Sequence, residues 1–291
     1  MNYVQFFLGL GLLGAIMTVA TTVDQAEAFE LTFEAHSAPL YAHPHDITLS
    51  PDQRFLYVAD NNNDRIAVLD PTSLDLVGSF AKGEVSEPHD VAFQADGKLL
   101  VADTGNNRIA IYQVSGAKGR FVGEVAGDFS RPEGVAVHPN GRIYVTGASS
   151  DNIIALINGN PVAKADGFSS PHDVAIAADG SVWFADAGSN RLVHMSDDLK
   201  TLNIIEGEPY KFDGPRYLDF DSKGHLDVAD KYAQKIKVLA PDNTLMYTLG
   251  QHRSGLGPGW FDRPEGVVIY TQHVWFSDTS NNRIVRYRLT E

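Results

Sequence analysis

Six polar side chains each follow a proline, and the prolines recur at intervals of 39 to 49 residues: Pro44, Pro88, Pro132, Pro171, Pro215 and Pro264. Neutral imidazoles and carboxylates are the usual protein ligands of Zn²⁺ besides thiolates. A guanidinium group binds carboxylates through paired hydrogen bonds. If the fold brings these side chains together, we expect a site for a metal ion or an anionic ligand. The six residues are His45, His89, Glu133, His172, Arg216 and Glu265.

Two overlapping sets of these residues are candidates for a metal site. One set contains the three histidines, His45, His89 and His172, from the first, second and fourth repeats. The other contains His89, His172 and Glu265, which come from alternate repeats and form a more symmetric trio. Zinc is the metal expected in either set, with one position left open for water or substrate. Alternatively, all six residues are caps, in which His or Glu binds the neighbouring backbone.

Further residues extend the candidate site. Tyr232 lies in the same repeat as Arg216, and in an enzyme it would remove a proton from a substrate that Arg216 binds. Trp260, close to Arg253 in a glycine-rich link, is a candidate ligand contact. Carboxylates directly follow the three histidines and are candidates for holding Ca²⁺ deeper in the structure; they are Asp46, Asp90 and Asp173.

The elements that must position these residues are internal repeats. Residues 88–93 (PHDVAF) match residues 171–176 (PHDVAI), and residues 131–137 (RPEGVAV) match residues 263–269 (RPEGVVI). Each repeat contains short apolar runs separated by turns rich in Gly, Asn and Asp, and no helical periodicity. This pattern predicts four short antiparallel strands per repeat.

A four-stranded sheet of this kind cannot bury both faces alone, so the repeats are expected to stack in a ring. The sequence predicts an all-β fold, a six-bladed β-propeller of four-stranded antiparallel blades. The last repeat ends after its third strand, and residues 31–35 read as a lone strand ahead of the first proline. We expect this strand to complete the sixth blade and to close the ring. Closure removes an open sheet edge that would promote aggregation.

Aspartates end the second strand of five repeats, and a cation follows each of them five positions later. In the third repeat both positions change together, to Gly147 and Asn152, which suggests that the two groups meet. We expect structural ion pairs, with the carboxylate also accepting turn amides. The alternative is that these groups form a ligand-binding ring. The predicted pairs are Asp60–Arg65, Asp103–Arg108, Asp186–Arg191, Asp230–Lys235 and Asp278–Arg283.

Residues 101–109 (VADTGNNRI) and 277–284 (SDTSNNRI) resemble the NHL-repeat consensus, and residues 250–261 resemble that family's glycine-rich link between blades. The resemblance covers nearly all of residues 30–291 and implies a six-bladed β-propeller. That fold hosts lyases, lactonase-like enzymes and pure binding modules, so the resemblance implies no single function.

The three Pro-His-Asp repeats also resemble those of peptidyl-α-hydroxyglycine α-amidating lyase. That resemblance implies zinc held by histidines of alternate blades, and a tyrosine and an arginine that act on the substrate. The matching residues here are Tyr232, in the segment Asp-Lys-Tyr, and Arg216. This chain departs from the pattern because its histidines do not alternate and Glu265 stands where a third one is expected.

The N-terminal segment reads as an export signal. Residues 4–23 carry no charge and are mostly apolar, and residues 26–28 (AEA) fit the small-x-small pattern of signal peptidase sites. We expect a cleaved signal at 1–28, one propeller domain at 29–291, and a periplasmic or extracellular location. If the segment is not cleaved, it is instead a membrane anchor, since about 20 apolar residues can span a bilayer.

Composition excludes several classes of protein. The chain has no cysteine, which rules out disulfides, thiolate zinc sites, Fe–S clusters and a catalytic thiol. The formal net charge of −14 disfavours nucleic-acid binding.

The leading prediction from the sequence is an exported propeller that binds a peptide or small anionic ligand at a polar channel mouth. A protein partner on the propeller face is a further prediction. The alternatives are a zinc-dependent lyase and, more weakly, a divalent-metal lactone hydrolase; metal content separates the first from the other two.

Overall fold

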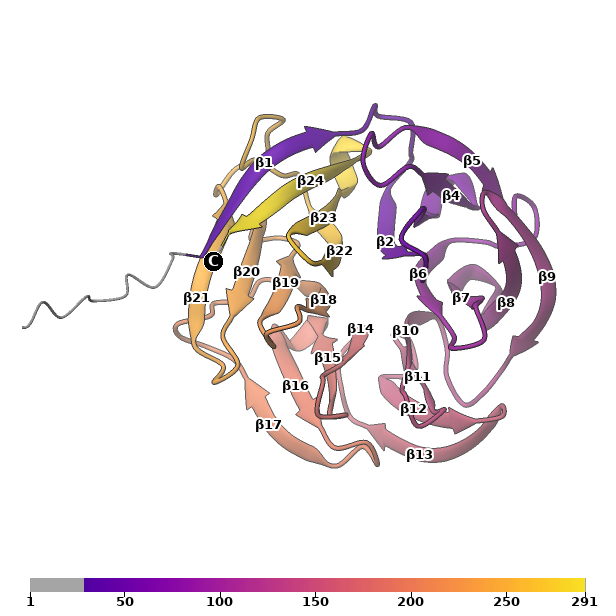
Figure 1. Ribbon diagram of the computed structural model, residues 1–291. Helices are drawn as coiled ribbons and strands as arrows, with labels where there is room; N and C mark the ends of the chain where they lie inside the picture. The colour runs from indigo at the N-terminus through magenta and orange to yellow at the C-terminus, as the bar shows by residue number, and fades with distance from the viewer. Residues whose placement is uncertain (1–28, 291) are drawn as a thin grey trace, which may run out of the picture.

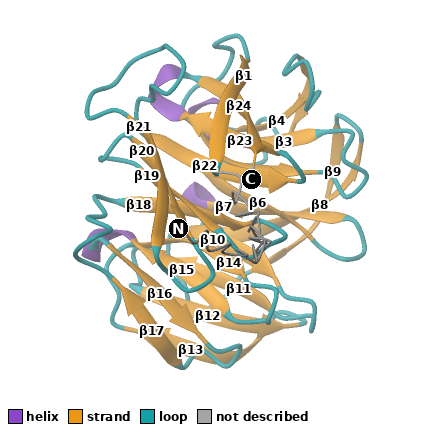
Figure 2. Ribbon diagram, turned by 60° about the vertical axis from the view of Figure 1, so that its left-hand side comes forward, coloured by secondary structure: helices purple, strands orange, loops and turns teal. Residues whose placement is uncertain are grey.

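The computed structural model describes residues 29–290, so the predicted export signal at 1–28 lies outside the described residues. Six four-stranded antiparallel sheets surround a central channel (Figure 1), which confirms the six-bladed β-propeller. Strands form the regular secondary structure of this region apart from four short 3₁₀ turns, and loops join them (Figure 2). None of the helices in residues 29–290 is long and apolar enough to cross a membrane.

The blades follow the six repeats along the chain. Blade 1 contains β2 (Pro44–Leu49), β3 (Leu56–Asp60), β4 (Arg65–Leu69) and β5 (Leu76–Phe80); blade 2 contains β6 (Pro88–Phe93), β7 (Lys98–Asp103), β8 (Arg108–Ser115) and β9 (Lys118–Val125). Blade 3 contains β10 (Pro132–Val137), β11 (Ile143–Gly147), β12 (Asn152–Ile157) and β13 (Asn160–Asp166); blade 4 contains β14 (Pro171–Ile176), β15 (Val182–Asp186), β16 (Arg191–Met195) and β17 (Thr201–Ile205). Blade 5 contains β18 (Pro215–Phe220), β19 (Leu226–Asp230), β20 (Lys235–Leu239) and β21 (Leu245–Gly250); blade 6 contains β22 (Pro264–Tyr270), β23 (His273–Asp278), β24 (Arg283–Thr290) and β1 (Glu30–His36). The 3₁₀ turns are η1 (Asn61–Asn63), η2 (Thr104–Asn106), η3 (Ala187–Ser189) and η4 (Thr279–Asn281).

The N-terminal strand closes the ring, as predicted. In Figure 1 the indigo β1 lies beside the yellow β24, and the two strands pair antiparallel, with Leu31 opposite Leu289 and Phe33 opposite Tyr287. Leu31 and Tyr287 are buried in the apolar cluster between blades 5 and 6. The first strand of the described chain therefore belongs to the last blade.

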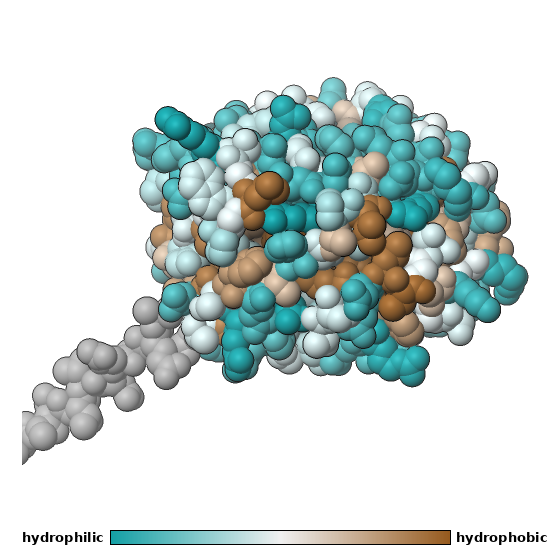
Figure 3. All heavy atoms as spheres, turned by 90° about the horizontal axis from the view of Figure 1, so that it is seen from above, coloured by the Kyte–Doolittle hydropathy of each residue, from teal (hydrophilic) through white to brown (hydrophobic). Residues whose placement is uncertain are grey.

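The core lies between neighbouring blades. Tyr57 of blade 1 and Tyr112 of blade 2 are fully buried in one cluster, and Tyr217 of blade 5 and Phe276 of blade 6 are buried in another. Burying a large apolar side chain contributes about 1.5–3 kcal/mol, so these contacts between sheets hold the ring together. The outer face seen in Figure 3 is mostly hydrophilic, with small hydrophobic groups among the polar side chains.

Four of the five predicted Asp–cation pairs form, with Nε–Oδ2 distances of 2.6–2.8 Å. The fifth prediction, Asp230–Lys235, is wrong, because Asp230 is paired with the buried Lys237 instead. Lys237 lies two residues after Lys235 on β20, where side chains return to the same face of the strand, and its Nζ takes the place of the Arg Nε that the other blades use. In blade 3, Asn152 takes over the link by donating to the backbone carbonyl of Asp128 at 2.7 Å.

Candidate functional site

A local irregularity at the start of each inner strand positions the candidate site. In β2, β6, β10, β14, β18 and β22 the strand register shifts directly after the opening proline. A bulge of this kind turns a side chain away from its regular direction. The six residues that follow the prolines lie in these bulges, so each blade directs one polar side chain toward the same end of the channel.

The structure brings the three histidines together at this channel mouth. One ring nitrogen from each of His45, His89 and His172 can be chosen so that all three lie within 4.8 Å of one another. The ring centroids of His45 and His89 are 4.3 Å apart, and those of His89 and His172 are 5.8 Å apart. All three side chains are buried. Three imidazoles at this separation match the donor set of a zinc site.

The two glutamates lie on opposite sides of the histidines. Glu133 Oε2 is 3.0 Å from His172 Nε2, and its Oε1 is 3.8 Å from His89 Nε2. Glu265 Oε2 is 3.0 Å from His45 Nδ1. Each carboxylate therefore stands next to an imidazole, where it can orient the ring and raise its basicity as a ligand.

Two cations complete the mouth. Arg216 Nη1 is 3.8 Å from Glu133 Oε2, and Lys231 Nζ is 2.5 Å from Glu265 Oε1. The sequence analysis did not predict Lys231 as a mouth residue. Its position directly after the strand-end aspartate, on the same turn as Tyr232, could have indicated it. These two cations offset the charges of Glu133 and Glu265, so the mouth carries no excess negative charge although the whole chain is acidic.

Two tyrosines border the site differently. Tyr232 is half-exposed, and its hydroxyl lies 3.5 Å from Arg216 Nη2. Tyr217 is fully buried; its hydroxyl donates to the carbonyl oxygen of His89 at 2.8 Å, and its ring lies 4.9 Å from that of His172. Nothing in the repeat pattern distinguished Tyr217 from a core residue, because its contact with blade 2 crosses the channel from blade 5.

Burial lowers the pKa values of two of the mouth histidines, His89 and His172. It lowers the pKa of His89 to about 3, with the neighbouring His45 adding to the effect, and it lowers the pKa of His172 to about 4. Burial also opposes ionisation of Glu133, but His172, His89 and Arg216 outweigh it and lower the pKa of this carboxyl. At neutral pH the imidazoles of His89 and His172 are uncharged, the form that binds metals, and Arg216 balances the charge of Glu133.

Buried polar atoms without an aligned hydrogen bond gather at the mouth. Several of these atoms have a charged neighbour at short distance, but the angles are unsuitable for a hydrogen bond. An unsatisfied buried polar atom costs about 1–3 kcal/mol, so this arrangement fits a site completed by a cation and its ligands. Within the described chain the atoms at the mouth are His45 Nδ1, His172 Nδ1, Glu133 Oε2, Arg216 Nε and both carboxylate oxygens of Glu265.

Trp260 is not brought to the histidines. Its side chain is partly exposed and packs on Gly255 and Gly257 of its own link, so close that a Cβ at Gly255 would lie 2.6 Å from the indole. In residues 29–290 no hydrogen bond or ring contact joins Trp260 to the six mouth residues.

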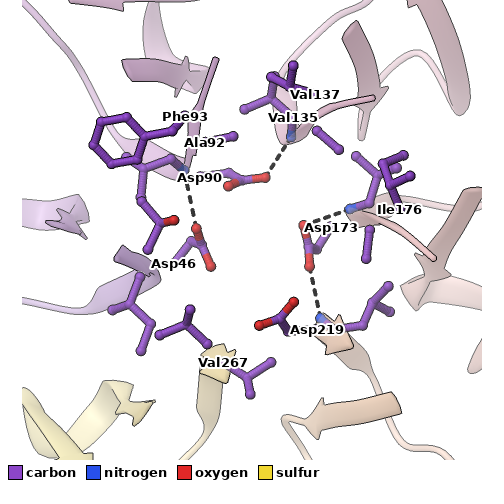
Figure 4. Close-up of a pocket in the computed structure, with 18 residues that line it drawn as sticks. Asp46, Asp90, Ala92, Phe93, Val135, Val137, Asp173, Ile176, Asp219 and Val267 are labelled. Carbon is purple, nitrogen blue, oxygen red and sulfur yellow. Dashed lines mark hydrogen bonds between the residues drawn. The ribbon is translucent and has the colours of Figure 1, made fainter. Parts of the chain in front are cut away.

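Deeper in the channel, aspartates point toward a cavity of about 280 Å³ (Figure 4). Asp90 accepts a hydrogen bond from the Val135 amide at 2.6 Å, and Asp173 accepts one from Leu218 at 2.8 Å, so each carboxylate joins its blade to the next. Asp219, which the sequence did not single out, accepts from Ile269 at 2.8 Å. These carboxylates have a structural role of their own, and the expected Ca²⁺ at Asp46, Asp90 and Asp173 stays a prediction.

Burial also governs the ionisation of these carboxyl groups. It raises the pKa of Asp90 to about 6 and that of Asp219 to about 7. The pKa values of Asp46 and Asp173 are also raised, first by burial and then by the charge of Asp90.

Comparisons with known proteins agree with the architecture. A family model described as "Lactonase, 7-bladed beta-propeller" matches residues 17–139, although the structure has six blades. No curated protein sequence matches the chain.

Solved propellers cover most of the chain at low sequence identity. A streptogramin B lyase structure is 19% identical, with a TM-score of 0.62 over 91% of this chain and 88% of that chain. Virginiamycin B lyase from Staphylococcus aureus is 14% identical, with a TM-score of 0.63 over 90% and 100%. An auxiliary nutrient binding protein from Bacteroides ovatus is 14% identical, with a TM-score of 0.69 over 91% and 78%. The chain is therefore a six-bladed β-propeller, and its likeness to these proteins is a likeness of fold.

Proposed function

We propose that the channel mouth binds a divalent transition metal and, beside it, a small anionic ligand or the carboxylate of a peptide. The observation that carries this proposal is the approach of three imidazole nitrogens to within 4.8 Å of one another. His45, His89 and His172 are favoured over the set that includes Glu265, because Glu265 Oε1 is already next to Lys231. Because Arg216 and Lys231 offset the charges of Glu133 and Glu265, a bound divalent metal would leave the mouth net positive, and the anionic group would bind beside the metal and Arg216.

Zinc content tests the metal site. The protein is purified without a chelator or a polyhistidine tag, equilibrated with ZnCl₂, dialysed and submitted to elemental analysis. We expect about one zinc per chain in the parent and in Glu133→Ala, and loss of zinc in His89→Ala and His172→Ala. His252→Ala, which removes an exposed histidine, is the matched control and should keep its zinc. A parent without stoichiometric zinc would end this proposal.

A metal-dependent lyase is the second candidate, and the contact between Tyr232 and Arg216 favours it. A bound metal would supply Lewis-acid polarisation of a substrate oxygen. Arg216 would orient the substrate carboxylate, and Tyr232 would take the proton from the substrate beside the mouth. Two structural neighbours are lyases, and the family model that matches part of the chain is a lactonase model.

Activity distinguishes binding from catalysis. Zinc-loaded protein is assayed with a peptidyl-α-hydroxyglycine, virginiamycin B and a γ-lactone. Turnover that falls at least tenfold in Tyr232→Phe while zinc content is unchanged supports an enzyme. The mass of the product then separates a lyase, which adds no water, from a lactone hydrolase, which adds one. If the peptide binds without turnover, the result supports a binding protein and not an enzyme.

Export remains part of this proposal. N-terminal sequencing of the mature protein tests it, with Phe29 expected as the first residue. The narrower NHL-type assignment also remains a prediction.

A further inference from the structure

A second polar cavity lies beside the mouth, next to blade 5. It has a volume of about 400 Å³ and is bordered by the link before β18, the turn after β19, and strands β20 and β21. Its lining combines two aromatic side chains with basic ones, and the residues that matter here are Tyr210, Lys211, Tyr232, Lys235 and His252. We call this cavity the blade-5 cleft. A volume of this size accommodates a small organic ligand.

Lys235 is the unusual residue of the blade-5 cleft. In four other blades the cation at this repeat position is paired with the strand-end aspartate, but in blade 5 Lys237 takes that partner. Lys237 Nζ also donates to the carbonyl oxygens of Tyr210, at 2.6 Å, and of Lys211, at 2.9 Å. In the described chain Lys235 is then left with neither an ion pair nor a side-chain hydrogen bond, although it lines the cleft.

The local backbone keeps space around Lys235. Its partner across the sheet is Gly250, whose φ is +121°. A Cβ at Gly250 would lie 2.3 Å from the carbonyl oxygen of Gln234 and 2.9 Å from the Lys235 Cα, so no larger residue fits there without a shift of the backbone. Of the other charged groups on the wall, Lys237 is paired with Asp230, Lys211 Nζ is 2.8 Å from Glu208 Oε1, and Asp213 is an exposed carboxylate.

Tyr232 separates the blade-5 cleft from the mouth. Its ring packs on Gly214, where a Cβ would lie 2.5 Å from Tyr232 Cδ2, and its hydroxyl faces Arg216. Lys231 Nζ lies 5.7 Å from the centre of the same ring. One aromatic ring therefore borders both the mouth, which has Arg216 and Lys231, and the cleft, which has Lys235.

We propose that the blade-5 cleft is a second anion-binding site, in which Lys235 binds a carboxylate or phosphate group and the rings of Tyr210 and Tyr232 contact the apolar body that carries it. An unpaired ammonium in a partly enclosed site interacts with an anion more strongly than in bulk water, because the effective dielectric constant is lower. The ligand class that fits is an elongated molecule with an anionic group at each end, one at the mouth and one at Lys235. The occupation of both ends by one molecule rests on the proposed function, whereas binding in the cleft does not.

The test uses two small aromatic anions on metal-free protein: phenyl phosphate, and hippurate as the carboxylate. Their dissociation constants are measured by isothermal titration calorimetry at low ionic strength. We expect Lys235→Gln to raise the dissociation constant about five- to tenfold, since it removes a charge-assisted contact. Lys118→Gln, which removes an exposed lysine on β9 of blade 2, should leave the constant unchanged. Binding of only one probe identifies which oxyanion the site accepts.

A second variant guards against a local folding effect of Lys235→Gln. Thr248→Asp adds a carboxylate at an exposed position of the cleft wall, and it should weaken the same probes by repulsion. The inference is overturned if the parent binds neither probe, or if Lys235→Gln and Thr248→Asp bind as the parent does.

Zinc content separates this inference from the proposed function. Lys235→Gln should bind zinc as the parent does, because Lys235 is not among the mouth residues. A parent that binds phenyl phosphate through Lys235 but holds no zinc would contradict the proposed function and leave the cleft site standing. A parent that holds zinc but binds neither probe would do the reverse.

Discussion

Asp103 offers the most direct test of how the repeats are held together. Its carboxylate is completely buried at the end of β7. Oδ1 accepts the backbone amide of Ser86 at 2.7 Å, Oδ2 accepts Arg108 Nε at 2.7 Å, and the Asn106 side chain donates to both oxygens at 2.9–3.0 Å. Substitution by alanine removes all of these contacts and adds no steric clash.

The expected loss follows from those contacts. A hydrogen bond to a charged group contributes about 1.5–3 kcal/mol, and contacts that share one carboxylate are not additive. Arg108 is less affected than a fully buried cation, because it keeps the Glu124 carboxylate at 2.6 Å and the carbonyl oxygen of Glu84 at 2.7 Å. We therefore expect Asp103→Ala to lower the free energy of unfolding by about 3 kcal/mol, which corresponds to a fall in the melting temperature of roughly 5–10 °C for a domain of this size.

The assay compares urea unfolding and thermal melting of Asp103→Ala with those of Asp96→Ala. Asp96 is an exposed aspartate of the same blade, whose contacts are with Lys98 in its own turn. Both variants lose one negative charge, so the comparison isolates the buried contacts. Asp96→Ala should cost less than about 1 kcal/mol. Equal stability of the two variants would refute the structural role of the buried aspartates.

Three further predictions concern ring closure, a buried carboxyl and the support of the mouth. Deletion of residues 29–36 removes β1 and leaves β24 as an open edge, so melting should lose cooperativity and light scattering should show aggregation; a truncated chain that melts like residues 29–291 would show that closure is unimportant. Burial raises the pKa of Asp219 to about 7 in the folded state, against an ordinary value of 3.8. As pH rises, this carboxyl therefore ionises in the unfolded chain before it does in the folded one, so the stability of the parent falls from about pH 4 to about pH 7. In Asp219→Asn this component disappears, so melting temperatures from pH 4 to pH 8 should give a different slope from that of the parent, and parallel slopes would contradict the raised pKa. Tyr217→Phe removes the hydrogen bond to the His89 carbonyl oxygen, so it should lower the free energy of unfolding by about 1 kcal/mol and weaken zinc binding, measured by competition titration. The control is Tyr144→Phe, which loses a comparable hydrogen bond to the Asp197 carbonyl oxygen and should lose similar stability with unchanged zinc affinity.

The architecture could be predicted from the sequence because each repeat specifies its own blade. The proline at each strand start, the aspartate at the end of the second strand and the turn after it recur in nearly every repeat, and a four-stranded unit has few ways to bury its faces. The closing role of β1 followed from counting strands, since the last repeat was one strand short. These features depend on contacts that are local or identical from blade to blade.

The candidate site was predictable in part for the same reason. Equivalent repeat positions lie at equivalent places around a ring, so the six residues after the prolines had to meet at one end of the channel. Their spacing could not tell which of them approach closely enough for a metal, and the two sets that the sequence left open differ only in whether His45 or Glu265 joins His89 and His172. The distances between the ring nitrogens favour the set with His45. The sequence could not show this, because packing across the channel decides where a side chain at a bulge points.

The tertiary structure decided the contacts that break the repeat. Tyr217 reaches His89 from a blade on another side of the channel, and Lys231 turns inward to Glu265. Lys237 replaces Lys235 as the partner of Asp230 and leaves Lys235 in the cleft. The repeat pattern in the sequence determines which position of a blade a residue occupies. Which neighbour its side chain reaches depends on side-chain length and on the packing of residues that are distant in sequence, and only the folded ring contains that information.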